Sequence, residues 1–198
     1  MIVAKNRYFI LHKPYKMLSQ FVGEKVGTML GEIDFNFPTG THAIGRLDND
    51  SEGLLLLTTN KKITKLLFES KTLHKRCYLV QVANAVSQET IAHLQAGVSI
   101  RIKGDVYWTS SPCEVTIINE PIIFNKINNN TQNIGIHTWL CITLTEGKFH
   151  QIRKMVFALR HRCKRLIRIS IEDLQLGNLA SGEVKEMHEE EFFRLLKI

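Results

Sequence analysis

Residues 43–62 read AIGRLDNDSEGLLLLTTNKK, a charged segment bounded by glycines that runs directly into four consecutive leucines. The leucines at 54–57 precede two threonines, and an apolar run of this length between turn residues is typical of a buried β-strand. The acidic side chains of Asp48, Asp50 and Glu52 therefore come just before a core strand, where the backbone is held in place. Three interpretations compete for them: a polar turn, a cation-binding loop, and a catalytic carboxylate.

The cation-binding interpretation fails when the positions are counted. Asp48, Asp50 and Gly53 fit the first, third and sixth positions of an EF-hand loop. The twelfth position would be Thr59, where a bidentate Glu is required, and a strand rather than a helix follows. A structural turn and a catalytic carboxylate stay equally open on these grounds, since Asp and Ser readily hydrogen-bond to nearby backbone.

The composition limits the kind of protein. The chain has 198 residues, of which 44% are hydrophobic, enough for one core or two modest lobes. No apolar run approaches the roughly 18 residues that span a bilayer, so no membrane partner is expected. The N-terminus lacks the features of a signal peptide, which predicts a cytoplasmic protein. The cysteines form no CxxC pair and no zinc-like cluster, which predicts reduced thiols and no metal site at Cys77, Cys113, Cys141 and Cys163.

The charge is more informative. Lys and Arg number 26 against 19 for Asp and Glu, which gives a net charge of +7. Residues 148–168 carry a dense run of Lys and Arg with no acidic residue, whereas residues 183–192 are acidic. A basic face favours a polyanion, because each phosphate contact releases counterions. The charge therefore predicts a nucleic acid as the partner.

Periodicity predicts a mixture of strands and helices without a strict βαβ rhythm. An Asn-rich tract at 125–133 is expected to be an exposed loop. The mixture favours an α+β fold with a largely antiparallel sheet. Strands are expected within 7–14, 54–57, 75–84, 97–108, 113–119 and 139–147, and helices at 61–70, 88–97 and 150–160. Ser87 is expected to cap the second helix and Gly97 to end it. Buried faces are expected where apolar residues recur with the period of a strand or a helix: Leu140, Ile142 and Leu144 in the strand at 139–147, and Ile152, Met155, Val156 and Leu159 in the third helix.

Five segments, in the right order along the chain, resemble the motifs of the RsuA/RluA-type pseudouridine synthases. The most specific is GRLDNDSEGLLLLTTN, which is similar to that family's GRLDxDTxGLLLLTND signature. The others are HKPYKMLSQF (12–21), KRCYLVQV (75–82), EGKFHQIRKM (146–155) and RLIRISIEDLQLGNLASGEVKEM (165–187). Together they cover nearly the whole chain.

The resemblance implies one pseudouridine synthase catalytic domain over residues 1–198, with a mixed, mostly antiparallel central sheet, flanking helices and two lobes around a catalytic cleft. The most similar members act on large-subunit (23S) rRNA and lack an S4 RNA-binding domain, and no S4 domain is expected here. The implied activity is isomerisation of one uridine of a single-stranded or bulged rRNA region to pseudouridine, by a monomer that needs no cofactor. Two alternatives stay open: a synthase of the same family with another RNA target, and a catalytically silent RNA-binding or ribosome-assembly protein.

The resemblance also assigns roles to residues. Asp48 matches the family's catalytic aspartate, and Arg153 matches the arginine that pairs with it. Tyr78 matches the aromatic residue that stacks on the extracted uracil, and Arg46 resembles the residue that enters the space that the base leaves. Basic residues expected to bind RNA as well are Lys13, Lys154, Arg165 and Arg168.

The chain departs from the family pattern in several places. Phe149-His150 and the stretch from Lys148 to Lys154 use His and Lys where Arg is common. His12 replaces Asn before Lys-Pro, and Ser51 replaces Thr in the aspartate segment. Glu172 stands where Gly is usual, which puts the backbone geometry of that turn in question.

Overall fold

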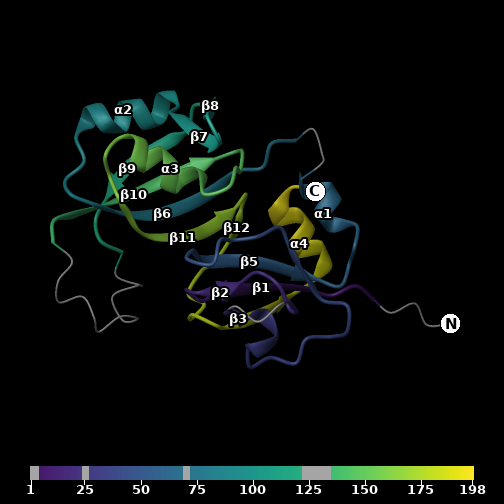
Figure 1. The fold of residues 1–198 in the computed structure, drawn as a ribbon. Helices are drawn as coiled ribbons and strands as arrows, with labels where there is room; N and C mark the ends of the chain where they lie inside the picture. The colour runs from purple at the N-terminus through teal and green to yellow at the C-terminus, as the bar shows by residue number, and fades with distance from the viewer. Residues whose placement is uncertain (1–4, 24–26, 69–71, 122–134) are drawn as a thin grey trace. The chain divides into compact units, whose positions relative to one another are not determined.

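The computed structural model describes residues 5–23, 27–68, 72–121 and 135–198, so the Asn-rich tract expected to be a loop at 125–133 lies outside the described residues. The chain divides into two compact units (Figure 1). Unit 1 comprises Met1–Arg76 and Ile167–Ile198, and unit 2 comprises Cys77–Leu166. Strand β11 (Cys163–Ile171) therefore begins in unit 2 and ends in unit 1.

The sheet of unit 1 is built around β5 (Glu52–Thr58), the strand that the leucine run predicted. β1 (Tyr8–Lys13) lies antiparallel along one edge of β5, and β13 (Val184–Met187) pairs with the other edge of β1. β4 (His42–Ile44) is also antiparallel to β5, whereas β11 runs parallel to it. The remaining elements of unit 1 are β2 (Met17–Leu18), β3 (Thr28–Met29), the 3₁₀ helix η1 (Leu30–Glu32), α1 (Ile63–Phe68), β12 (Leu174–Gln175) and α4 (Glu189–Leu196).

Every residue of β5 is buried, because strands pair along both of its edges and apolar side chains cover its faces. Burying one leucine side chain stabilises a fold by about 1.5–3 kcal/mol, so the run at 54–57 anchors the start of β5 firmly. Helix α4 adds to this core at the C-terminal end of the chain. Its Phe192 ring lies 4.9 Å from the ring of Tyr8 on β1, and Leu196 is fully buried.

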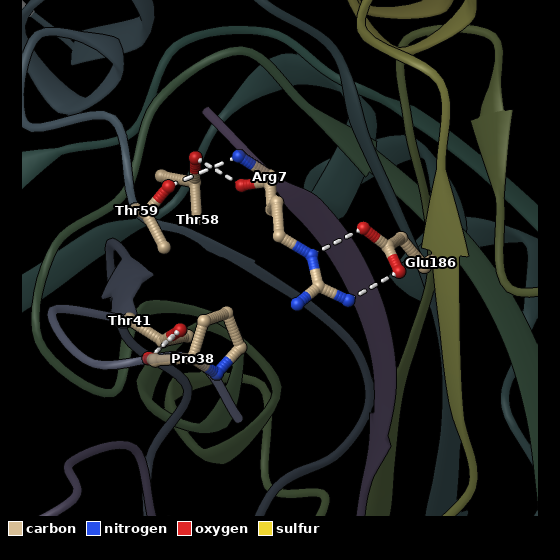
Figure 2. Close-up of polar contacts among 6 residues, drawn as sticks. All are labelled: Arg7, Pro38, Thr41, Thr58, Thr59 and Glu186. Atoms are coloured by element: carbon tan, nitrogen blue, oxygen red, sulfur yellow. Dashed lines mark hydrogen bonds and ion pairs between the residues drawn. The ribbon is translucent and has the colours of Figure 1, made fainter. Parts of the chain in front are cut away.

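Arg7 ties the entry of β1 to chain segments on both sides (Figure 2). Its backbone N–H donates to Thr59 Oγ1 at 3.0 Å, and its carbonyl accepts the Thr58 hydroxyl at 2.8 Å. Its guanidinium donates two hydrogen bonds to Glu186, at 2.6 and 2.7 Å, which raise the pKa of Arg7 and lower the pKa of Glu186. Both side chains are partly exposed, so solvent screens the ion pair. The pair therefore adds little to the free energy of folding and mainly favours the register between β1 and β13.

Unit 2 has its own core between strands and two helices. Strand β6 lies between the first residues of β11 and β10, and β9 pairs with the far edge of β10. Helix α3 lies beside β7, and α2 beside β9 (Figure 1). The elements are β6 (Arg76–Ala83), α2 (Gln88–Ala96), β7 (Ser99–Lys103), β8 (Val106–Thr109), β9 (Glu114–Ile118), β10 (His137–Leu144) and α3 (Gln151–Ala158).

The expected α+β fold with a mostly antiparallel sheet is confirmed, and so are several details. Ser87 caps α2 by accepting the Thr90 N–H, and Gly97 ends that helix at φ +103°. Alternating residues of β10 from Leu140 to Leu144 are buried as the pattern predicted. Among the described residues, none of the helices combines the length and the apolar character needed to cross a bilayer.

Glu172, at a position where the family pattern has glycine, adopts a backbone conformation that glycine tolerates best. Its φ is +50°, in the left-handed region that strains residues with a side chain. Its carboxylate accepts the Lys75 N–H at 2.7 Å and lies 3.1 Å from the Lys197 ammonium. Burial is the strongest influence on the Glu172 pKa and raises it, but these bonds outweigh burial and the net pKa is lowered. The side-chain contacts therefore compensate for the backbone strain.

We expect Glu172→Ala to destabilise the protein by about 1–3 kcal/mol, because it loses the carboxylate contacts and keeps the strained φ. Glu172→Gly loses the same contacts but relieves the strain, so it should be about 1 kcal/mol more stable than the Ala variant. Urea denaturation of both variants measures the difference. Asp173→Ala is the control, since Asp173 also pairs with Lys197 but has no positive φ. An Ala variant as stable as the Gly variant would contradict this account.

Candidate active site

Hydrogen bonds within unit 1 fix the turn that carries Asp48, both before and after that residue. The Ser19 hydroxyl donates to the Leu47 carbonyl at 2.8 Å and accepts the Leu47 N–H at 3.0 Å, so it clamps the residue before Asp48. The Asp48 carbonyl accepts the Ser51 N–H at 3.0 Å, which closes the turn. The Asp48 side chain is half-buried, whereas Ser51 and Glu52 are buried. The backbone at Asp48 is therefore preorganised.

Gly53 ends this turn between two cationic residues. It pairs with Lys13 on β1 along one edge of β5 and with Arg168 on β11 along the other. Its φ is +99°, and a Cβ at this position would lie 2.3 Å from the Arg168 carbonyl oxygen. Only a glycine allows β11 to approach this closely.

Lys13 is buried rather than presented to RNA. Its side chain is 0% exposed, and its ammonium donates to the carbonyls of Pro14 at 2.9 Å and Met17 at 2.6 Å. Burial lowers the pKa of Lys13 to about 8, although the carboxylates of Glu52, Asp50 and Asp48 oppose that shift. The expected contact of Lys13 with RNA does not fit this geometry, because a buried ammonium cannot reach a phosphate. Lys13 instead supplies positive charge beneath the acidic turn.

Arg168, also expected to bind RNA, is buried as well. Its side chain is 4% exposed, and its Nε donates to the Leu54 carbonyl at 2.8 Å. The guanidinium thus braces the start of β5 from the side opposite Lys13. Two buried cations together offset the negative charge that Asp48, Asp50 and Glu52 bring to the turn.

The lowered pKa of Lys13 predicts a pH dependence of stability. Between pH 8 and 10.5 the unfolded chain binds more protons at this residue than the folded chain, so the free energy of unfolding rises with pH. The rise between pH 8 and pH 10 should be about 2 kcal/mol and be absent from Lys13→Met. Urea denaturation of both proteins at pH 8 and pH 10 measures it, and parallel changes in the two proteins would contradict the assignment.

The other predicted site residues lie in unit 2, except Arg46. Arg46 is exposed in the Asp48 turn of unit 1. Tyr78 on β6 is partly buried and packs against the core of unit 2. Arg153 and Lys154 follow each other on α3, and Arg165 lies on the first part of β11; all three are partly exposed.

Helix α3 starts from a loop that side chains hold in place. The buried Gln151 amide donates to Glu146 Oε1 at 2.7 Å, and its oxygen accepts the Lys148 N–H at 2.9 Å. The Glu146 carboxylate also accepts the N–H and the hydroxyl of Ser111, at 3.0 and 2.8 Å. This network fixes the first turn of the helix on which Arg153 lies. The sequence motif pointed to the helix but gave no signal for Ser111.

Cys77, the neighbour of Tyr78, was expected only as a reduced thiol. It is free, like the three other cysteines. Its Sγ lies 3.2 Å from Sγ of Cys141 on β10, the next strand. The hydrogen bond with Cys141 lowers the pKa of Cys77 to about 6 and raises that of Cys141.

Comparison with known proteins identifies the family. Residues 7–158 match the family described as RNA pseudouridylate synthase. The chain belongs to this family. It is 33% identical over 187 residues to ribosomal large subunit pseudouridine synthase E of Vibrio parahaemolyticus, covering 93% of this chain and 75% of that protein. The enzyme of the same name from Vibrio vulnificus is also 33% identical over 187 residues, covering 93% of this chain and 76% of its own.

The fold agrees with this membership. A crystal structure of a pseudouridylate synthase aligns with a TM-score of 0.78 at 24% identity, covering 98% of this chain and 75% of that one. The chain is thus an RNA pseudouridine synthase, an enzyme that isomerises uridine in RNA. The family resemblance that the five motifs carry is confirmed.

Proposed function

We propose that the protein isomerises one uridine of large-subunit (23S) ribosomal RNA to pseudouridine, with Asp48 as the catalytic carboxylate. The observation that carries the proposal is the half-buried Asp48 on a clamped turn, at the position of the family's aspartate. The names of the Vibrio relatives support the choice of large-subunit RNA. The protein acts as a monomer in the cytoplasm, where ribosomal RNA is made.

The reaction needs a carboxylate but no external reactant. The C1′–N1 bond of the uridine breaks, the uracil turns within the site, and C5 forms the new bond to C1′. The C5 proton leaves to solvent, and N1 takes up a proton, so atoms and charge balance. Asp48 can serve by adding to C1′ or C6, or by removing a proton from C2′.

The other assigned residues support this carboxylate and the base. Arg153 keeps Asp48 ionised, because a guanidinium favours the charged form of a carboxylate. Tyr78 stacks on the extracted uracil, and Arg46 fills the space that the base leaves. Asp48 belongs to unit 1, and Tyr78 and Arg153 belong to unit 2.

Contacts with the RNA have to offset the free-energy cost of extracting the base. Unstacking and unpairing a nucleotide costs a few kcal/mol. The basic run at 148–168 supplies phosphate contacts through exposed or partly exposed cations, for which Lys154, Lys164 and Arg165 are candidates. Single-stranded or bulged RNA is the favoured substrate, because its bases are already accessible.

Release of tritium from [5-³H]uridine-labelled RNA tests this function. Purified wild-type protein should release tritium from 23S rRNA transcripts and leave 16S rRNA transcripts unchanged. Release from 16S rRNA alone would favour the same chemistry on another RNA. Binding without release from any RNA would favour a silent RNA-binding or ribosome-assembly protein.

Two variants separate chemistry from binding in the same assay. Arg153→Ala should lower kcat by about 100-fold or more, since the charged form of Asp48 loses its partner. Lys164→Ala should leave kcat unchanged, weaken binding and reduce its salt dependence. Equal and salt-independent effects of the two variants would contradict these assignments.

A further inference from the structure

An exposed aromatic ring stands at the start of α3. The Phe149 side chain is 70% exposed, although phenylalanine is usually buried. One face of its ring stacks on the His150 ring, with centroids 3.9 Å apart and an angle of 19° between the planes. Neither residue has a role in the proposed chemistry.

The backbone holds this ring pair in a fixed position. His150 has φ +55°, in the left-handed region, and strain of this kind persists where the surroundings impose it. The surroundings are the Glu146–Gln151 network, which bonds both ends of the loop. The backbone of the loop that carries the Phe149 ring is therefore held by hydrogen bonds, so less backbone order is lost when a partner binds.

Lysine ammonium groups lie over two aromatic rings of this region. The Lys154 ammonium is 5.5 Å from the centroid of the Phe149 ring, and the Lys148 ammonium is 5.4 Å from the centroid of the Trp108 ring. No acidic residue occurs between 148 and 168. An exposed Phe149 ring with ammonium groups close by fits a nucleobase and its neighbouring phosphates, because bases stack on rings and ammonium groups bind phosphate. An acidic protein surface would use the cations but not the exposed ring.

We propose that Phe149, supported by His150 and flanked by Lys148 and Lys154, is a stacking platform for an unpaired base of the RNA substrate, separate from the base that is isomerised. This inference rests on the proposed function for its RNA substrate. The platform binds a base beside the target and so helps to offset the cost of extracting the target uridine. Base stacking is tolerant of sequence, so the platform adds affinity more than specificity.

Binding of a fluorescein-labelled oligouridylate, followed by fluorescence anisotropy, tests the platform without turnover. Phe149→Ala should weaken binding about 5- to 100-fold, and Phe149→Trp should restore it. Phe157→Ala is the matched control, since Phe157 lies on α3, the helix that begins two residues after Phe149, and is 76% exposed. The proposal would be overturned if Phe149→Ala bound the oligouridylate as tightly as wild type. It would also be overturned if Phe157→Ala lost as much affinity as Phe149→Ala.

Salt dependence separates stacking from charge. Phe149→Ala should leave the slope of log affinity against log salt unchanged, whereas Lys154→Ala should reduce it by about 0.7. A reduced slope in Phe149→Ala would overturn the stacking role. Since these measurements need no catalysis, an inactive wild type that binds through Phe149 refutes only the proposed activity. An active wild type whose Phe149→Ala variant binds normally refutes only the platform.

Discussion

Asp48→Asn is expected to lower kcat for pseudouridine formation by about a thousand-fold or more and to change the Kd for RNA by less than about 3-fold. The amide has nearly the same shape as the carboxylate, so the Ser19 clamp and the turn should persist. It can neither act as a nucleophile nor accept a proton at neutral pH. Single-turnover tritium release measures the chemical step, and anisotropy measures the binding.

Asp50→Asn is the matched control for this prediction. Asp50 is a second half-buried carboxylate in the same turn, two residues further on. Its amide variant removes the same charge near Lys13, so a general electrostatic effect would appear in both variants. We expect Asp50→Asn to retain kcat within about 10-fold. Equal losses in the two variants would show that the turn needs charge, and that Asp48 has no special chemical role.

Gly53→Ala is expected to have the largest effect on stability, a loss of more than about 3 kcal/mol. The new Cβ would meet backbone atoms of Arg168, at 2.3 Å from the oxygen and 2.8 Å from the nitrogen, and a backbone cannot rotate away as a side chain can. β11 would have to separate from β5 at the point where the Asp48 turn ends. Chemical denaturation measures the loss, and an insoluble protein would be its extreme form.

Gly40→Ala shows how much of that loss is due to the clash. Gly40 also has a positive φ, +85°, but no atom lies within 4 Å of its added Cβ. It should cost only about 1 kcal/mol, the price of the dihedral alone. If Gly53→Ala were no worse than Gly40→Ala, the close approach of β11 would not matter for the turn.

Local patterns predicted the elements that local forces determine. The leucine run predicted β5, Ser87 and Gly97 bounded α2, and the spacing of Ile152, Met155 and Val156 predicted the buried face of α3. The family motif also placed Asp48 at the entry of a core strand, where the structure has it. Each of these features depends on neighbours a few residues away.

Features that depend on distant pairing were missed. β11 was not predicted, because lysines and arginines interrupt its apolar residues and read as a solvent-exposed run. The same bias placed Lys13 and Arg168 on an RNA-binding surface, since lysine and arginine are seldom buried. Their burial follows from the pairing of β1 and β11 with β5, which no local pattern encodes.

Helix α4 was missed although a signal existed. Three glutamates fill its first turn, where they favour the helix dipole, and Phe192 and Leu196 are spaced for one buried face. The acidity of residues 183–192 was interpreted only as a charge contrast. Glu172, which departs from the family pattern, adopts a positive φ, and its side chain makes contacts that glycine cannot.

The pseudouridine content of ribosomal RNA tests the central claim most directly. Ribosomal RNA from a strain that lacks this gene is digested to nucleosides and fragments, and pseudouridine is mapped by mass spectrometry with and without a plasmid copy of the gene. We predict that one pseudouridine of 23S rRNA disappears in the deletion, returns with the wild-type gene, and stays absent with Asp48→Asn. An unchanged 23S rRNA, or full restoration by the Asp48→Asn gene, would contradict the account.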